Sequence, residues 1–365
     1  MIYVKIIRPI FFRFDPEKVH NFVVHLIGWA GRNRLVRRAL ALFLGEPSSL
    51  LETKLGGLKL KTPVGLAAGF DKKVEALEIY PALGFGFAEI GSITNRPVPG
   101  NPKPRLWRIP EDKGLIVYYG LYNLGAEVSK QKLLKVAQRE IPYGLSIAPT
   151  TDVPLVEMIN DYLKTFETLA PVADYITFNV SCPNVASCNH FTQVTFIVDL
   201  IKAVALKKKE IVYDKEIFFK IGPDLSFIDL DPIIDACLQN DITGIIATNL
   251  VKNRQGIQFK SSTEKLNHPG GISGLVVQKK SDETIRYIYK KSGGKLKIIG
   301  LGGILSAEDA YRKIRLGASA LQIFTGFIYN GPTFIHTINR QLTSFLKRDG
   351  FKNISEAIGA DVRSE

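Results

Sequence analysis

Cys182 lies in the segment Asn179-Val-Ser-Cys-Pro-Asn184, between two asparagines and directly before a proline. A cysteine near a strand end is more often a small buried hydrophobic residue than a reactive group. Its free pKa of about 8.5 nevertheless makes a thiol a better acid–base group near neutral pH than a serine hydroxyl. Together with Asn249, the two asparagines offer donors and acceptors that suit a planar, amide-rich ligand. We therefore interpret Cys182 as a candidate base beside a ligand-binding site.

Two lysines accompany apolar, β-branched runs, Lys72 shortly after residues 64–68 and Lys220 within residues 217–221. A lysine at a strand end is usually solvated or paired with a carboxylate. At an enclosed rim, however, a cation can hold an anionic substrate or an electron-rich flavin. No group of carboxylates, cysteines and histidines has the spacing of a metal site. The sequence thus predicts a site for an anion or an organic cofactor and no metal centre.

Glycine-rich segments follow two further apolar runs, and a third glycine-rich segment lies between the runs at 244–248 and 297–301. Gly302-Gly303 follows residues 297–301, Thr325-Gly326 follows residues 320–324, and Gly270-Gly-Ile-Ser-Gly274 precedes both. Glycine also serves tight turns, so one such pair is weak evidence for a ligand. Three glycine-rich loops where barrel proteins bind phosphate favour a phosphorylated cofactor.

These residues need a scaffold that brings their strands to one rim. Eight short apolar runs are separated by segments of helical spacing, at residues 64–68, 87–93, 143–148, 175–180, 217–221, 244–248, 297–301 and 320–324. Near-continuous apolar strands, each followed by a helix, are typical of a parallel sheet that is buried on both faces. Eight such units in about 270 residues fit a closed α/β barrel of the (β/α)8 TIM type, whose chemistry lies at the C-terminal strand ends.

The first 45 residues differ from the rest in charge and pattern. They hold eight basic and two acidic residues, interleaved with bulky apolar residues such as Phe22 and Trp29. Asp15-Pro16-Glu17 is a helix start signal, and we expect one helix to Gly31 and an arginine-rich one to Gly45. An apolar face beside cations suits an amphipathic helix at a membrane surface, although a helical cap packed on the main domain has the same pattern. We predict this extension at residues 1–45 and the barrel at residues 46–365.

Composition sets the remaining limits. The chain has 365 residues, a net charge of +13 and 45% hydrophobic residues, which excludes disordered and collagen-like proteins. Three cysteines, Cys182, Cys188 and Cys237, cannot form a disulfide framework and fit a reducing compartment. No apolar run approaches the roughly 20 residues of a membrane-spanning helix. The basic charge lacks any recognised nucleic-acid motif, so we expect no nucleic-acid partner.

The chain resembles the dihydroorotate dehydrogenase family of flavin barrels over nearly its whole length. The resemblance rests on Gly65-Leu-Ala-Ala-Gly-Phe-Asp-Lys72, Gly100-Asn-Pro-Lys-Pro-Arg105, Asn179-Val-Ser-Cys-Pro-Asn184, Ile246-Ala-Thr-Asn249 and Gly270-Gly-Ile-Ser-Gly274. The N-terminal helices are similar to those of the membrane-associated, quinone-reducing class, in which they form a hydrophobic tunnel. The resemblance implies oxidation of dihydroorotate to orotate in pyrimidine biosynthesis, with FMN as cofactor and a membrane quinone as electron acceptor.

The resemblance also implies roles for individual residues. It assigns FMN contacts to Ala67, Ala68, Gly69, Lys72, Lys220, Thr248, Ser273, Gly274, Gly302, Gly303, Phe324 and Thr325. It assigns the substrate to Lys72, Asn179, Asn184 and Asn249, and the quinone to Arg108. In the implied reaction Cys182 takes the proton from substrate C5, and flavin N5 takes the hydride from C6. With no leader before Met1, we expect a peripheral location on the cytoplasmic side of the cell membrane.

Some positions depart from the family pattern. The quinone class normally has serine as its base, whereas Cys182 is the residue of the soluble class. Val117 and Ser146 stand where the family has asparagines, and Tyr122 and Leu250 replace smaller polar residues. Losing one hydrogen bond to a ligand costs about 1–3 kcal/mol. Two alternatives therefore remain open at this point: a related FMN enzyme acting on another cyclic amide or acid, and a non-catalytic flavin-binding relative.

Overall fold

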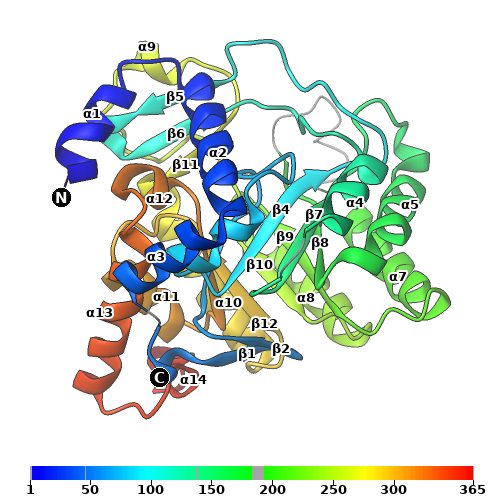
Figure 1. Ribbon diagram of the computed structural model, residues 1–365. Coiled ribbons are helices and arrows are strands. Elements are labelled where there is room, and N and C mark those ends of the chain that lie inside the picture. The colour runs from blue at the N-terminus through cyan, green and yellow to red at the C-terminus, as the bar shows by residue number, and fades with distance from the viewer. Residues whose placement is uncertain (1, 46, 137–138, 183–192, 365) are drawn as a thin grey trace.

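A closed barrel of eight parallel strands forms the centre of the protein in its computed structural model, which describes residues 2–45, 47–136, 139–182 and 193–364 (Figure 1). The barrel strands are β3 (Val64–Leu66), β4 (Phe87–Ile93), β7 (Tyr143–Ile147), β8 (Tyr175–Asn179), β9 (Glu216–Ile221), β10 (Gly244–Ala247), β12 (Lys297–Leu301) and β13 (Ala320–Ile323). Each pairs in parallel with its neighbours, and β13 closes the ring onto β3. All eight coincide with the apolar runs of the sequence, so the predicted (β/α)8 barrel is confirmed.

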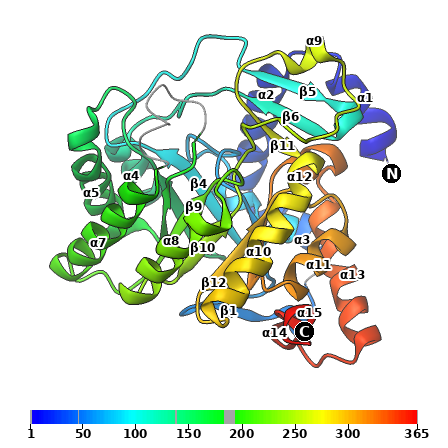
Figure 2. The same cartoon turned by 180° about the vertical axis from the view of Figure 1, so that it is seen from behind.

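Helices surround the barrel, as the alternating pattern predicts (Figure 2). They are α4 (Ala126–Leu134), α5 (Met158–Leu169), α7 (Val194–Glu210), α8 (Phe227–Gln239), α10 (Gln278–Ser292), α11 (Ala307–Arg315), α12 (Thr325–Asn330) and α13 (Phe334–Asp349). The short helices α9 (Thr263–Leu266), α14 (Ile354–Ala357) and α15 (Ala360–Arg363) complete the set. Their buried faces pack on strands that are apolar on both sides, so one continuous core joins barrel and helices.

Two small sheets lie at opposite ends of the barrel in Figure 1. One is a hairpin of β1 (Thr53–Leu55) and β2 (Leu58–Leu60). The other is an antiparallel sheet of β5 (Leu106–Ile109), β6 (Gly114–Val117) and β11 (Gly271–Gly274). The glycine-rich segment 270–274, expected to be a loop, is therefore a strand. Its glycines allow close approach, because a Cβ on Gly270 would lie 2.2 Å from the carbonyl oxygen of Val117.

The N-terminal extension is helical, as predicted. It consists of a π-helical turn (Tyr3–Ile7), α1 (Arg8–Phe11), α2 (Pro16–Arg32) and α3 (Arg34–Leu44). Asp15 caps α2 by accepting a hydrogen bond from the Lys18 amide, and Asn33 caps α3 through the amides of Leu35 and Val36. Within the described residues, no helix is long and apolar enough to cross a membrane.

Helix α2 approaches the barrel closely because two glycines face it. A Cβ on Gly28 would lie 2.4 Å from the carbonyl oxygen of Glu75, and one on Gly31 would lie 3.1 Å from Cβ of Ile79. Val24 is buried on the same side, whereas Phe22 lies on the opposite side and is exposed. Glycine at these two positions therefore sets how near the helix can pack.

Replacement of Gly28 by alanine should destabilise the protein, although alanine favours a helix by about 1 kcal/mol over glycine. The clash with a backbone oxygen forces α2 outward, and we expect a net loss of about 1–3 kcal/mol in the free energy of unfolding. Gly31→Ala is the matched control with the milder contact, and it should cost less. Urea unfolding of both variants measures the difference, and a Gly28→Ala protein as stable as the parent would contradict this account.

Candidate active site

One cavity of about 450 Å³ lies where the barrel, the β5–β6–β11 sheet and the N-terminal helices meet. The site residues predicted from the sequence line it together, with one exception: Ala67, Ala68, Gly69, Lys72, Arg108, Asn179, Cys182, Lys220, Thr248, Asn249, Ser273, Gly274, Gly302, Gly303, Phe324 and Thr325. Asn184 lies outside the described residues. Residues as far apart in the sequence as Ala67 and Thr325 therefore share one chamber, because the parallel strands all end at the same rim.

Two asparagines are held on one wall by a shared serine. The Asn179 side-chain oxygen accepts hydrogen bonds from the Ser181 amide (3.2 Å) and hydroxyl (3.0 Å). The Asn249 amide donates to the carbonyl oxygen and the hydroxyl of the same Ser181, at 3.2 and 3.0 Å. The Asn179 amide also donates to Ser92 Oγ, which lies 2.9 Å from Ser146 Oγ. Ser146, one of the positions expected to depart from the family pattern, thus supports Asn179 through Ser92.

Cys182 follows Ser181 directly and lines the cavity. Only 7% of its surface is exposed, and it packs with Leu121, Ala148 and Met158. Apolar side chains therefore contact Cys182 where it borders the cavity. Among the departures from the family pattern, Val117, Leu250 and Tyr122 also line this cavity.

Lys72 is partly buried and lies at the junction between barrel and N-terminal helix. Its Nζ lies 3.5 Å from His20 Nε2 and 4.1 Å from the ring centre of Tyr119. Burial lowers the pKa of Lys72 to about 7, against the opposing influence of the Glu17 carboxylate. Burial, reinforced by Lys72, also lowers the pKa of His20 well below its usual value, so the imidazole is neutral.

The Glu17 carboxylate that raises the Lys72 pKa is buried in an ion pair. Arg105 donates to it from Nε at 3.2 Å and from Nη2 at 2.9 Å, and the two side chains are 5% and 8% exposed. The Arg105 guanidinium also lies over the rings of Tyr119 and Tyr122. A residue of α2 is thereby joined to Arg105, which directly precedes the strand β5 beside the cavity.

The floor of the cavity carries polar atoms that no described residue satisfies. Thr248 Oγ1 and Gln322 Oε1 are buried without a hydrogen-bond partner among the described residues, and both residues line the cavity. Burial lowers the pKa of Lys220 on the same floor, opposed by Glu89. Such unmet donors and acceptors at the base of a chamber fit a planar ligand with polar edges.

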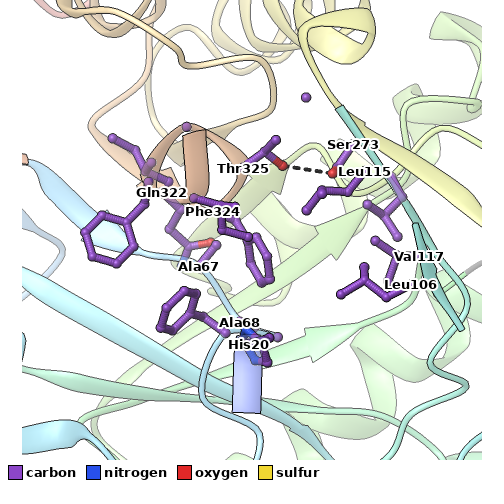
Figure 3. A pocket seen from close by; sticks show the side chains of 18 of the residues that line it. His20, Ala67, Ala68, Leu106, Leu115, Val117, Ser273, Gln322, Phe324 and Thr325 are labelled. Atoms are coloured by element: carbon purple, nitrogen blue, oxygen red, sulfur yellow. Dashed lines mark hydrogen bonds between the residues drawn. The ribbon is translucent and has the colours of Figure 1, made fainter. Parts of the chain in front are cut away.

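One wall of the cavity is lined by glycines and hydroxyls, as a phosphate site requires. Gly302 and Gly303 have φ of +116° and +69°, and a Cβ on Gly303 would lie 2.4 Å from Gln278 Cβ. Ser273 Oγ and Thr325 Oγ1 lie 2.8 Å apart across the same wall (Figure 3). The site therefore fits a planar cofactor with a phosphate, since both the polar floor and the glycine wall open into one space.

Arg108 connects the cavity with the N-terminal segment. Its Nη1 donates to the carbonyl oxygen of Phe14 at 2.7 Å, and its guanidinium lies 4.6 Å from the ring centre of Phe12. Helices α1 and α2 supply further apolar lining residues, including Phe11 and Leu26. The cavity thus extends from the polar floor into an apolar section beneath the N-terminal helices.

Several site residues were not predicted from the sequence. His20, Gln322 and Ser92 line the cavity, and Ser181 joins the two asparagines (Figure 3 labels His20 and Gln322). Helical spacing could have placed His20 on one face with Glu17, three positions earlier. Ser92 and Gln322 have partners that are distant in the chain, so no local signal marks them. Ser181 lies two residues from Asn179 inside the motif 179–184, and only its contact with Asn249 depends on the fold.

Comparisons with known proteins agree with the site. The family model described as dihydroorotate dehydrogenase matches residues 50–346. Curated relatives named dihydroorotate dehydrogenase (quinone) include one from Gloeobacter violaceus, 38% identical over 97% of this chain and 98% of its own length. Another, from Nostoc punctiforme, is 37% identical over 100% and 99%.

Solved structures give the same result for the fold and the family. The crystal structure of DHODH from Eimeria tenella in complex with ferulenol superposes with a TM-score of 0.85 at 30% identity, covering 95% of this chain and 96% of that one. The match includes nearly the whole chain. The chain therefore belongs to the dihydroorotate dehydrogenase family.

Proposed function

We propose that the protein oxidises dihydroorotate to orotate, a step of pyrimidine biosynthesis, with FMN as cofactor and a membrane quinone as electron acceptor. The observation that carries the proposal is the single cavity in which Cys182, the paired asparagines, two lysines and the glycine wall meet. FMN, when bound, accepts two electrons from the substrate and passes them to the quinone. The names of the relatives, dihydroorotate dehydrogenase (quinone), support the same assignment.

The glycine wall and the floor would hold FMN. Gly302, Gly303, Gly274, Ser273 and Thr325 offer backbone amides and hydroxyls to its phosphate. The unsatisfied Thr248 hydroxyl and Lys220 offer hydrogen bonds to polar edges of the ring system. Ala67, Ala68, Gly69, Lys72 and Phe324 would complete the contacts.

The substrate would lie against the asparagine wall. Asn179 and Asn249 are fixed by Ser181, so their amides need no reorganisation when a cyclic amide binds. Asn184 is assigned to the substrate as well, and Lys72 provides a positive charge for its carboxylate. Cys182 Sγ would accept the proton from C5, beside the apolar side chains of Leu121, Ala148 and Met158.

Residues 1–45 would bind the membrane surface and guide the quinone to the cavity beside Arg108. Helix α2 exposes Phe22 and Trp29 by 58% and 66%, whereas Leu26, 47% exposed, also lines the cavity. The side of α2 that bears His20 and Ile27 lines the cavity instead. An exposed apolar side beside basic residues favours peripheral binding to a bilayer, here on the cytoplasmic side of the cell membrane. Residues 46–365 form the FMN-binding barrel in this proposal.

Removal of the thiol separates catalysis from cofactor binding. Cys182→Ala should retain FMN but slow the bleaching of the flavin by dihydroorotate at least about 100-fold, since a general base contributes that much or more. Anaerobic stopped-flow absorbance measures this step. Cys237→Ala, which removes the other described cysteine from the core of α8, is the matched control and should react at the parental rate. Parental bleaching by Cys182→Ala would refute the assignment of the base.

The charge of Lys72 should make orotate binding depend on pH. Below pH 7 the ammonium is protonated and attracts the orotate carboxylate, and above its pKa of about 7 this attraction is lost. We expect the dissociation constant, measured by flavin difference spectra, to rise as pH increases from 6 to 9. Glu17→Gln should move the midpoint to lower pH because this carboxylate raises the Lys72 pKa. Lys72→Arg should flatten the profile, and a flat profile in the parent protein would contradict the prediction.

The exposed side of α2 should govern binding to uncharged lipid. Replacing Phe22 and Trp29 by glutamine should lower partition into phosphatidylcholine vesicles at least about tenfold, because each side chain loses apolar burial. The control replaces Val212 and Ile228, which are 85% and 84% exposed elsewhere, by glutamine. Vesicle sedimentation measures both proteins. Equal binding by the two double variants would contradict a membrane role for this side.

A further inference from the structure

A second cavity of about 250 Å³ lies outside the active site, between α3 and the barrel. Its cationic lining consists of Arg34, Arg37, Arg38 and Lys61, and Glu140 is the acidic side chain among its described lining residues. We propose that this cavity binds the phosphate of an anionic phospholipid headgroup. The inference rests on the proposed membrane binding of residues 1–45 and assigns that surface a specific lipid site.

The cations converge from two distant parts of the chain. Arg34, Arg37 and Arg38 follow the i, i+3, i+4 spacing that places side chains on one side of a helix, and Lys61 follows β2. Because helix and barrel meet here, four positive charges are held around one hollow. Like charges repel at this distance, so an anion bound among them lowers the electrostatic energy.

The arginines are not equivalent. Arg37 Nη1 donates to the carbonyl oxygen of Gly31, and its Nε lies 3.9 Å from Glu140 Oε1. These contacts hold the Arg37 side chain in place. Arg34, Arg38 and Lys61 are exposed, and no carboxylate of the described residues lies within 4.0 Å of their charged groups. These three side chains can therefore turn to an external phosphate without breaking an ion pair to a described residue.

The apolar neighbours of the cavity identify the source of the phosphate. Leu35, Leu42 and Phe43 of α3 are 74%, 86% and 82% exposed. Leu35 and Leu42 lie three and four positions from Arg38, hence beside it on the helix surface. A free phosphate makes no favourable contact with apolar side chains. A phospholipid, in contrast, places its acyl chains against them and its headgroup against the arginines.

This apolar surface continues the one proposed to enter the membrane. Helices α2 and α3 contact each other and lie on the same side of the barrel (Figure 1). Each of them exposes large apolar side chains. A headgroup held against α3 would fix the rotation of the protein on the bilayer, which apolar insertion alone leaves variable.

The test compares two sets of vesicles, one of pure phosphatidylcholine and one containing phosphatidylglycerol as the anionic lipid. The pocket variant is Arg34→Gln, Arg38→Gln and Lys61→Gln in the FMN-loaded, full-length protein. Arg37 is kept because it supports the fold. The control variant, Lys209→Gln, Lys290→Gln and Lys347→Gln, loses the same charge from exposed positions on α7, α10 and α13. FMN content and thermal unfolding establish that both variants are folded.

We expect the parent and the control to prefer anionic vesicles, and the pocket variant to lose at least about tenfold of that preference while binding pure phosphatidylcholine normally. An equal loss in both variants would show attraction by net charge alone and overturn the site. Binding of inorganic phosphate by the parent without any preference for anionic vesicles would show a free-anion site and overturn the lipid assignment. If the parent binds neither vesicle, the proposed membrane function fails as a whole, an outcome distinct from the loss of anionic preference alone.

Discussion

The buried ion pair between Glu17 and Arg105 is the contact on which the shape of the active site depends. It joins α2 to Arg105, directly before β5, with both charges almost fully enclosed, and Arg105 also donates to the carbonyl oxygens of Pro99 and Asn101. Removing one partner of a buried pair typically costs about 3–5 kcal/mol, because the other charge is left without compensation. The N-terminal helix is therefore a wall of the cavity and a structural part of the barrel enzyme.

That ion pair also sets the electrostatics of the chamber. Glu17 favours the protonated form of Lys72, while burial and Arg105 oppose it. The pKa of Lys72 is therefore about 7. His20, which lies beside Lys72, has a pKa well below its usual value. Lys220 is a second buried amine, on the floor. An anionic ligand relieves the cost of these buried charges, which explains why a site for a carboxylate and a phosphate can be otherwise apolar.

The two sides of helix α2 in the N-terminal segment have different roles. The side facing inward carries Glu17, His20 and the close-packed Gly28, and it is positioned by contacts with the barrel. The side facing outward carries the exposed aromatic residues Phe22 and Trp29. Membrane attachment and the shape of the cavity are thereby linked through one rigid helix, since movement of α2 displaces residues of both surfaces.

Local sequence patterns were sufficient for the barrel and for its rim. The eight strands are short runs of apolar residues. Because these runs are continuous and do not alternate with polar residues, they predict strands that are buried on both faces. The residues that follow each strand meet at one end of the barrel because parallel strands share a direction. The sequence alone therefore groups Lys72, Asn179, Thr248 and Gly302 at one rim.

The contacts between distant side chains required the tertiary structure. Segment 270–274 forms a strand because β6 offers it an antiparallel edge, which glycine composition does not reveal. His20 lies against Lys72 although 52 residues separate them, and Ser181 joins Asn179 to Asn249. The sequence by itself determined which residues reach the rim, through periodicity and strand direction. Only packing decided which of them touch, because contacts between side chains depend on helix approach and loop path, which local pattern does not encode.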